Sequence, residues 1–211
     1  MQFIRSAHRL SPAVVFATAL CLALIMPASA GMTAEPHHHP SLMTEAENGY
    51  LRKVQTYEIP PTTLLRADGT RTSLVDVLDR DQAVMLNFIF TTCKAVCPIM
   101  TGTFAAVQKQ LGNDRDRVQL ISISIDPEHD RPEKLLNYSR KYSTDTNWQF
   151  FTGTLPDIIA LQKAFDAYRG NKMNHVPTTY LRTSREAPWV RIEGFANASE
   201  LIEEYHRLLA P

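Results

Sequence analysis

The sequence predicts an α/β sandwich, in which helices pack on both faces of a central and partly parallel sheet. Residues 84–90 form a continuous apolar run, and residues 118–125 are rich in β-branched residues; both have the length of strands that are buried on both faces. Segments with the apolar periodicity of helices lie between and after these runs. Strand patterns that alternate with helix patterns of this length favour a sheet covered by helices.

A hairpin is expected near the start of the folded region. Asp68-Gly69 is a strong turn signal between two short strand-like runs, so residues 62–72 should form this hairpin. Residues 178–182 and 189–192 are expected to form two further strands joined by a turn.

Four helices are expected around these strands. The first covers residues 98–111, and two more should begin near Asp130 and Thr154, each followed by an acidic residue three positions later. The chain closes with an amphipathic helix, whose apolar positions are Leu201, Ile202, Tyr205, Leu208 and Leu209.

Residues 1–30 have the anatomy of a secretory signal peptide. Arg5 and Arg9 precede an apolar run, and Ala28-Ser29-Ala30 fits cleavage after Ala30. The run is short for a membrane span, which needs about 20 apolar residues, but an uncleaved anchor stays an open alternative. We therefore expect an exported, periplasmic protein, either soluble or anchored at the outer face of the inner membrane.

Residues 31–50 are expected to be a flexible tether, and residues 51–211 the folded domain. The tether carries His37, His38 and His39. Adjacent imidazoles on a flexible segment can hold a transition metal ion loosely, but such histidines are more often simply solvated.

The charge balance excludes one class of partner. The chain has 22 basic and 22 acidic side chains, so it lacks the basic excess that binding to a phosphate backbone requires. We therefore expect no nucleic acid partner.

The chemistry is expected at Cys93 and Cys97, the two cysteines outside the signal segment. They stand directly after a buried strand and at the start of a helix, where unpaired backbone N–H groups favour a thiolate, and Lys94 adds a positive charge. If residues 93–97 are helical, a spacing of four puts both sulfurs on one face. They can then form a reversible disulfide or close on a soft metal ion.

A purely structural disulfide is the alternative interpretation of this pair. It would close a very short loop, whereas the entropic stabilisation from a disulfide grows with loop length. A bridge across one helical turn is expected to be strained and easily reduced, which is typical of a redox-active disulfide.

The combined motifs resemble those of the Sco/SenC copper proteins of cytochrome oxidase assembly. The resemblance covers roughly residues 55–210 and rests on Thr91-Thr92-Cys93 with Cys97-Pro98, on the strand ending in Ile125-Asp126-Pro127-Glu128, on residues 148–153, and on a later His175. It implies a thioredoxin-like fold, a three-layer sandwich with a central mixed sheet and an N-terminal hairpin extension. It also implies a copper ion held by Cys93, Cys97 and His175, which agrees with the preference of copper(I) for thiolates and of both copper states for imidazole.

The function implied by the resemblance is that of a copper metallochaperone for the CuA centre of a cytochrome oxidase. Its partners would be the copper-bearing oxidase subunit or another exported cuproprotein, with a periplasmic thiol reductase or copper donor upstream. The alternative is a thiol-disulfide oxidoreductase that uses the same cysteines. A copper sensor cannot be separated from the first interpretation by sequence, and a peroxidase is disfavoured because Phe90 and Leu86 occupy the positions of its threonine and proline.

The sequence departs from the family pattern at three places. Lys94-Ala95 replaces the Pro-Asp that many members carry between the cysteines, and Asn174 replaces an acidic residue before the histidine. Pro177 opens a segment similar to the cis-proline loop of thiol-disulfide oxidoreductases, so we expect a cis peptide before it. These departures shift some weight from copper delivery to the thiol-disulfide oxidoreductase. His129 and His206 have no such context and are expected to be solvated.

Overall fold

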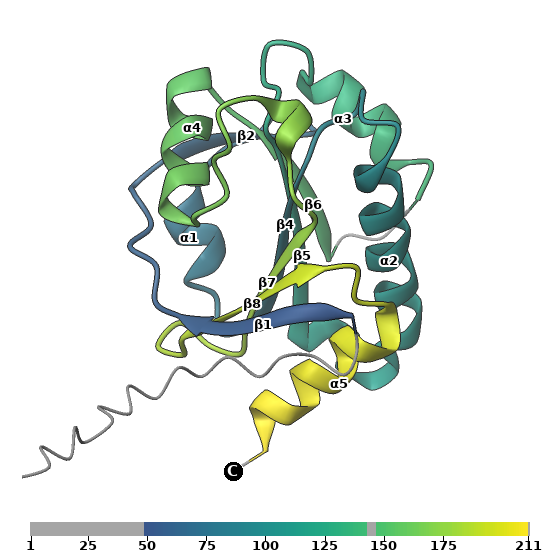
Figure 1. Cartoon of the computed structure of the whole chain (residues 1–211). Helices are drawn as coiled ribbons and strands as arrows, with labels where there is room; N and C mark the ends of the chain where they lie inside the picture. Colours follow the sequence, from purple (N-terminus) through teal and green to yellow (C-terminus); the bar gives the residue numbers. More distant parts are fainter. Residues whose placement is uncertain (1–48, 143–146, 211) are drawn as a thin grey trace, which may run out of the picture. The chain divides into compact units, whose positions relative to one another are not determined.

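The folded region is built on one mixed sheet of eight strands in the order β1-β8-β7-β4-β5-β6-β2-β3 (Figure 1). The computed structural model describes residues 49–142 and 147–210. The predicted signal segment and the tether histidines His37–His39 lie outside the described residues. The strands are β1 (Tyr50–Gln55), β2 (Thr63–Arg66), β3 (Arg71–Ser73), β4 (Ala83–Ile89), β5 (Val118–Ser124), β6 (Trp148–Thr152), β7 (Thr178–Arg182) and β8 (Trp189–Gly194).

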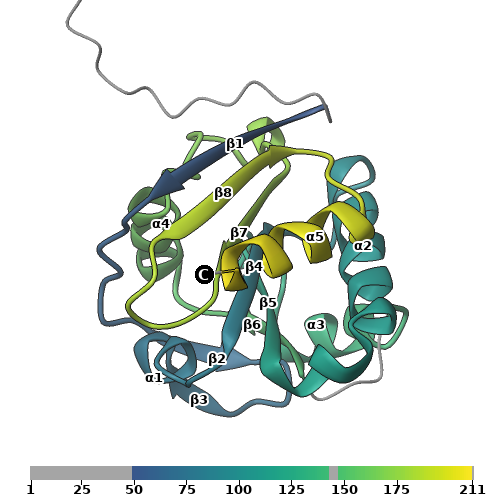
Figure 2. The same cartoon turned by 90° about the horizontal axis from the view of Figure 1, so that it is seen from below.

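Helices cover both faces of this sheet. The helices are α1 (Leu74–Leu78), α2 (Val96–Gln110), α3 (Pro132–Ser139), α4 (Leu155–Ala164) and α5 (Ala198–Leu209), with short 3₁₀ helices η1 (Gly112–Arg117) and η2 (Lys172–Asn174). Figure 2 shows α1 and α4 on one face, and α2, α3 and α5 on the other. The predicted three-layer α/β sandwich is therefore confirmed.

The centre of the sheet is parallel and fully buried. Strand β4 pairs with β5, and β5 with β6, in parallel. Every residue of β4 and β5 is buried, as expected for apolar runs inside a helix-covered sheet. Because the carboxyl ends of parallel strands meet at one edge, the loops that follow β4 and β5 lie side by side.

The predicted hairpin is confirmed at one edge of the sheet. Strands β2 and β3 pair antiparallel, and β2 also pairs with β6. Gly69 takes a φ of +89° at the turn, a conformation that L side chains rarely adopt. At the opposite edge, β1 was not anticipated, and it begins at Tyr50, one residue before the expected start of the domain.

The other predicted elements differ from the structure mainly at their ends. Helix α2 covers Val96–Gln110 rather than residues 98–111. Thr154 caps α4 as expected, because its hydroxyl accepts from the amide of Asp157. In α5, Leu201 and Tyr205 are buried, whereas Leu209 is 50% exposed. Within residues 49–142 and 147–210, no helix is long and apolar enough to cross a membrane.

Candidate functional site

The two cysteines lie at the junction between β4 and α2. Strand β4 ends at Ile89, and α2 begins at Val96, so Cys97 is in the first turn of the helix while Cys93 precedes it. The condition that residues 93–97 be helical is not met, because the helix begins only at Val96. The chain makes a tight turn instead, in which the Cys93 amide donates to the Phe90 carbonyl at 3.1 Å.

This turn places the Cys93 sulfur over the open end of α2. The Cys97 amide donates to the Cys93 sulfur at 3.4 Å. Burial raises the pKa of the Cys93 thiol, but hydrogen bonds from the backbone amides of Cys97, Ala95 and Val96 outweigh it, and the pKa is lowered overall. The sequence predicted a lowered pKa, and its direction is confirmed. Lys94, however, is exposed and is not among the groups that lower it.

The second cysteine is in a different environment. Cys97 is 0% exposed, whereas Cys93 is partly exposed. Burial raises the pKa of the Cys97 thiol strongly, and the nearby charges of Cys93 and Asp130 add to this effect. The pair therefore consists of one partly exposed thiol with a lowered pKa and one buried thiol with a raised pKa.

A buried carboxylate braces the turn before Cys93. Asp130 is 0% exposed and accepts from the Thr91 amide at 2.9 Å, from the Thr91 hydroxyl at 2.5 Å and from the Ser124 hydroxyl at 2.6 Å. The expectation that Asp130 caps the following helix is wrong, because Arg131 is the residue at the N-cap of α3, without a side-chain hydrogen bond. The carboxylate instead ties the cysteine loop to the end of β5.

His175 follows η2 and reaches back to the central sheet. Its Nε2 atom lies 2.9 Å from the carbonyl oxygen of Phe88 in β4. Because a carbonyl oxygen only accepts, Nε2 must carry the proton in this hydrogen bond. Burial lowers the pKa of His175, which the bond to Phe88 offsets in part and nearby Arg169 reinforces. The neutral ring therefore leaves Nδ1 with a free lone pair, the arrangement typical of a metal-binding histidine held by a backbone carbonyl.

Cys93, Cys97 and His175 do not form a closed metal site in this structure. The structure brings Cys93 and Cys97 together, but among the described residues no three His, Cys, Asp or Glu side chains are grouped closely enough to hold a metal ion. Two sulfurs and an imidazole nevertheless match the ligands that copper prefers. To share an ion, the two sulfurs and the imidazole must come closer together than they lie in this structure.

The other histidines lie away from this junction. His129 contacts the ammonium group of Lys134, and the exposed His206 pairs with Asp114 at 3.0 Å. Both side chains are exposed, as expected.

The cis peptide before Pro177 stays a prediction. The Pro177 carbonyl accepts from the Gly194 amide at 2.9 Å.

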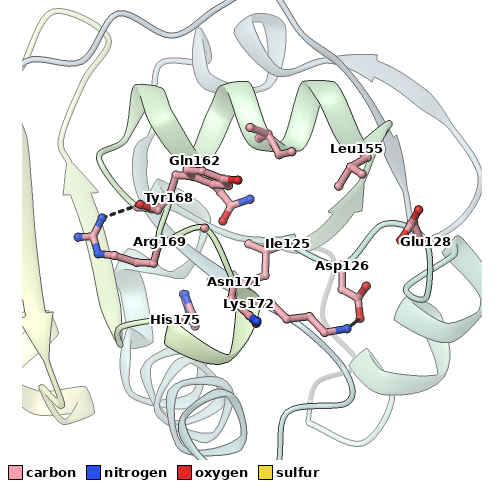
Figure 3. A pocket seen from close by; sticks show the side chains of 13 residues that line it. Ile125, Asp126, Glu128, Leu155, Gln162, Tyr168, Arg169, Asn171, Lys172 and His175 are labelled. Atoms are coloured by element: carbon pink, nitrogen blue, oxygen red, sulfur yellow. Dashed lines mark hydrogen bonds and ion pairs between the residues drawn. The ribbon is translucent and has the colours of Figure 1, made fainter.

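A pocket of about 370 Å³ beside His175 was missed by the sequence interpretation. Its wall contains Lys172, whose ammonium group lies 2.5 Å from the carboxylate of Asp126 (Figure 3). The Asp126-Pro127-Glu128 motif pointed to this region only through the resemblance. The two members of the ion pair are 46 positions apart, so no local pattern could reveal them.

Comparisons with known proteins agree with this architecture. Residues 55–210 match the family model SCO1/SenC. A curated relative, the SCO1 protein homolog of Bacillus subtilis (strain 168), is 37% identical over 98 residues, which are 46% of this chain and 50% of that protein. The alignment thus spans about half the length of this curated relative.

Solved structures show the same fold. A SCO1/SenC family lipoprotein from Bacillus anthracis str. Ames is 27% identical, with a TM-score of 0.64 over 75% of this chain and 98% of that one. BsSco, a member of the Sco family of cytochrome c oxidase assembly proteins in which a disulfide switch was identified, is 28% identical, with a TM-score of 0.62 over 74% and 95% of the two chains.

Copper-bound ScoI from Bradyrhizobium japonicum is 23% identical, with a TM-score of 0.59 over 71% of this chain and 98% of that one, a likeness that shows the fold. The family model covers most of the chain, and the relatives share its sheet and helices. This protein belongs to the SCO1/SenC family and has its thioredoxin-like fold.

Proposed function

We propose that this protein is a copper metallochaperone, which binds copper through Cys93, Cys97 and His175 and delivers it to the CuA centre of a cytochrome oxidase. The observation that carries the proposal is the cysteine pair at the start of α2, where the Cys97 amide donates to the Cys93 sulfur at 3.4 Å. Membership of the family supports it, as do relatives described as oxidase assembly proteins or solved with copper bound.

Capture of the copper ion follows from the different exposure and pKa of the two cysteines. Cys93 is partly exposed and has a lowered pKa, so its thiolate is the first ligand that copper meets. Cys97 then loses its proton as its sulfur binds, because metal binding displaces protons from thiols. Two thiolates suit copper(I) and give the cargo ion a site sheltered on one side by the core.

His175 supplies the third ligand through Nδ1. Its Nε2 proton is engaged by Phe88, which orients the ring and fixes the tautomer. The imidazole matters most for copper(II), because copper(II) favours nitrogen ligands more than copper(I) does. Since His175 is not grouped with the cysteines in this structure, closing the site needs the cysteine loop to move toward a His175 loop that stays in place.

Release uses the exposed side of the same site. A ligand from the recipient can reach copper beside Cys93 while Cys97 stays buried in the chaperone. The recipient we propose is the copper-bearing oxidase subunit, with another exported cuproprotein as the alternative. Delivery there requires export, for which the segment before residue 31 would serve as a cleaved signal or an anchor.

Copper stoichiometry tests this proposal. We expect the pre-reduced protein to bind one copper(I) ion per chain, and the Cys93→Ser, Cys97→Ser double variant to bind none under a competing chelator. Equal copper retention by both proteins would overturn the assignment of the cysteines.

A second candidate function is thiol-disulfide exchange with cysteines of the oxidase copper site. It is favoured by the asymmetry of the pair, because an exposed thiolate can attack a disulfide and a buried neighbouring thiol can then resolve it. Thiol trapping in glutathione buffers should show a two-electron dithiol/disulfide transition. A pair that never oxidises, or that is reduced only on unfolding, would exclude this function.

A further inference from the structure

One side chain joins the two loops of the proposed copper site. Lys172 is the first residue of η2, and its ammonium group extends along the pocket to Asp126 at the end of β5 (Figure 3). The N···O distance is 2.5 Å, and the two side chains are 40% and 10% exposed. The ion pair thus has a shielded acidic partner and a half-exposed basic one.

Asp126 is a fixed point for this contact. Its amide donates to the Ser124 hydroxyl at 3.1 Å, and its carbonyl accepts from the amides of His129 at 3.0 Å and Asp130 at 2.8 Å. These bonds hold the residue in a tight turn at the end of a buried strand. A group paired with this carboxylate is therefore held to the rigid sheet.

Lys172 also touches the cysteine loop. Its ammonium group lies 5.7 Å from the centroid of the Phe90 ring, within the range of a cation–π contact. The carbonyl of Phe90 accepts from the amide of Cys93. The same lysine therefore contacts the residue that starts the turn of the first cysteine.

The histidine is connected to Lys172 through the backbone. The His175 amide donates to the Lys172 carbonyl at 3.1 Å, which closes the single turn of η2. The η2 turn therefore links the anchored lysine directly to the residue whose ring bonds to Phe88.

We propose that Lys172 is a positioning residue for the copper site, which holds the His175 loop beside the cysteine loop through Asp126 and Phe90. This inference rests on the proposed function and goes beyond it. The role belongs to the lysine and its carboxylate partner, which do not themselves bind the ion. It explains how a histidine at the end of a short, partly exposed turn is kept against β4, the strand that leads into the cysteine loop.

The expected effect is on copper(II) more than on copper(I). Without the anchor, the His175 loop spends less time in the arrangement that can bind, and the apparent affinity falls in proportion to that fraction. We expect Lys172→Met to weaken copper(II) binding about tenfold, if roughly a tenth of the molecules keep the loop in place. Copper(I), held mainly by two thiolates, should change much less.

The experiment measures copper(I) and copper(II) affinity by competition with chelators, together with the sulfur-to-copper(II) charge-transfer absorption band. The variants are Lys172→Met, Lys172→Arg and the double variant Asp126→Asn, Lys172→Met. The double variant leaves no unpaired carboxylate, so it replaces the single variant if Lys172→Met folds poorly. Lys163→Met is the matched control, because the Lys163 ammonium group lies 5.4 Å from the centroid of the Tyr168 ring, near the same pocket. The dithiol/disulfide potential is measured for each protein.

The proposal predicts weaker copper(II) binding and an altered absorption band for Lys172→Met and for the double variant, with recovery in Lys172→Arg. Lys163→Met should match the wild type, and all potentials should agree. Wild-type copper(II) affinity in Lys172→Met and the double variant, while His175→Ala is weakened, would overturn this inference alone. If His175→Ala also binds copper like the wild type, both the inference and the proposed third ligand are wrong.

Discussion

The carboxylate of Asp130 accepts two hydrogen bonds from Thr91, one from its amide and one from its hydroxyl, although the two residues are 39 positions apart. Thr91 stands two positions before Cys93, so this contact fixes the start of the cysteine turn. The same carboxylate accepts from Ser124 at the end of β5. A fully buried acid thus ties the reactive loop to the sheet.

Removal of this carboxylate should destabilise the fold. Asp130→Ala leaves a backbone amide and two hydroxyls without their acceptor. An unsatisfied buried group costs about 1–3 kcal/mol, and because the two Thr91 groups are only part-buried while the Ser124 hydroxyl is fully buried, we expect a loss of about 2–4 kcal/mol in the free energy of unfolding. Urea denaturation measures it. Asp116→Ala, at an exposed site, is the control and should stay within about 0.5 kcal/mol of the wild type. A comparably small change for Asp130→Ala would mean that the network contributes little.

The cysteines should differ sharply in reactivity. In the folded protein, iodoacetamide should modify Cys93 at neutral pH and spare Cys97, because the first thiol is accessible with a lowered pKa and the second is buried with a raised one. Peptide mass mapping over a pH series gives both rates. Similar rates at the two positions would contradict the structure.

The same assay separates the two sources of the lowered Cys93 pKa. The sequence suggested Lys94, whereas the structure assigns the effect to backbone amides of the first turn of α2. We therefore expect Lys94→Glu to change the alkylation rate of Cys93 less than twofold, since exposed charges interact weakly through water. A rate that falls tenfold would restore the lysine as the main cause.

His175 should make stability depend on pH. Burial lowers its pKa in the folded state below the ordinary value of 6.5. As the pH falls below that value, the unfolded chain takes up a proton that the folded protein does not, so stability decreases by at most about 1.4 kcal/mol per pH unit from this group. Above the pKa that His175 has in the unfolded chain, the imidazole is neutral in both states, and its contribution to stability is fully present.

Denaturation of the wild type and of His175→Gln between pH 7 and 5 measures this contribution. The glutamine amide can still donate to Phe88 but does not titrate, so the variant should lose less stability on acidification. His129→Gln, which removes an exposed imidazole, is the comparison. Identical slopes for His175→Gln and the wild type would contradict the assignment.

Local patterns were sufficient for much of the fold. The apolar runs of β4 and β5, the Asp68-Gly69 turn and the Thr154 cap are each determined by a few neighbouring residues, and each was predicted correctly. Strand β1 was missed because an edge strand paired on one side carries no continuous apolar run.

Long-range contacts account for what the sequence did not reveal. Asp130 has the local signature of a helix cap, but the donors of Thr91 and Ser124 satisfy it instead. Lys172 looks like an ordinary surface lysine until the fold brings Asp126 to it. Spacing alone identified Cys93 and Cys97, whereas His175 was identified only through the family resemblance.

The most direct test of copper delivery as the function is the substitution His175→Ala, because disulfide exchange does not need this imidazole and a tight copper(II) site does. We expect copper(II) affinity to fall sharply, copper(I) affinity to fall less, and the dithiol/disulfide potential to stay within about 30 mV of the wild type, which corresponds to about 1.4 kcal/mol. Cytochrome oxidase activity in cells that carry the variant then decides between the two functions. Failed oxidase assembly with an intact redox couple is the result that copper delivery predicts, and normal assembly would show that the protein acts as a thiol reductant instead.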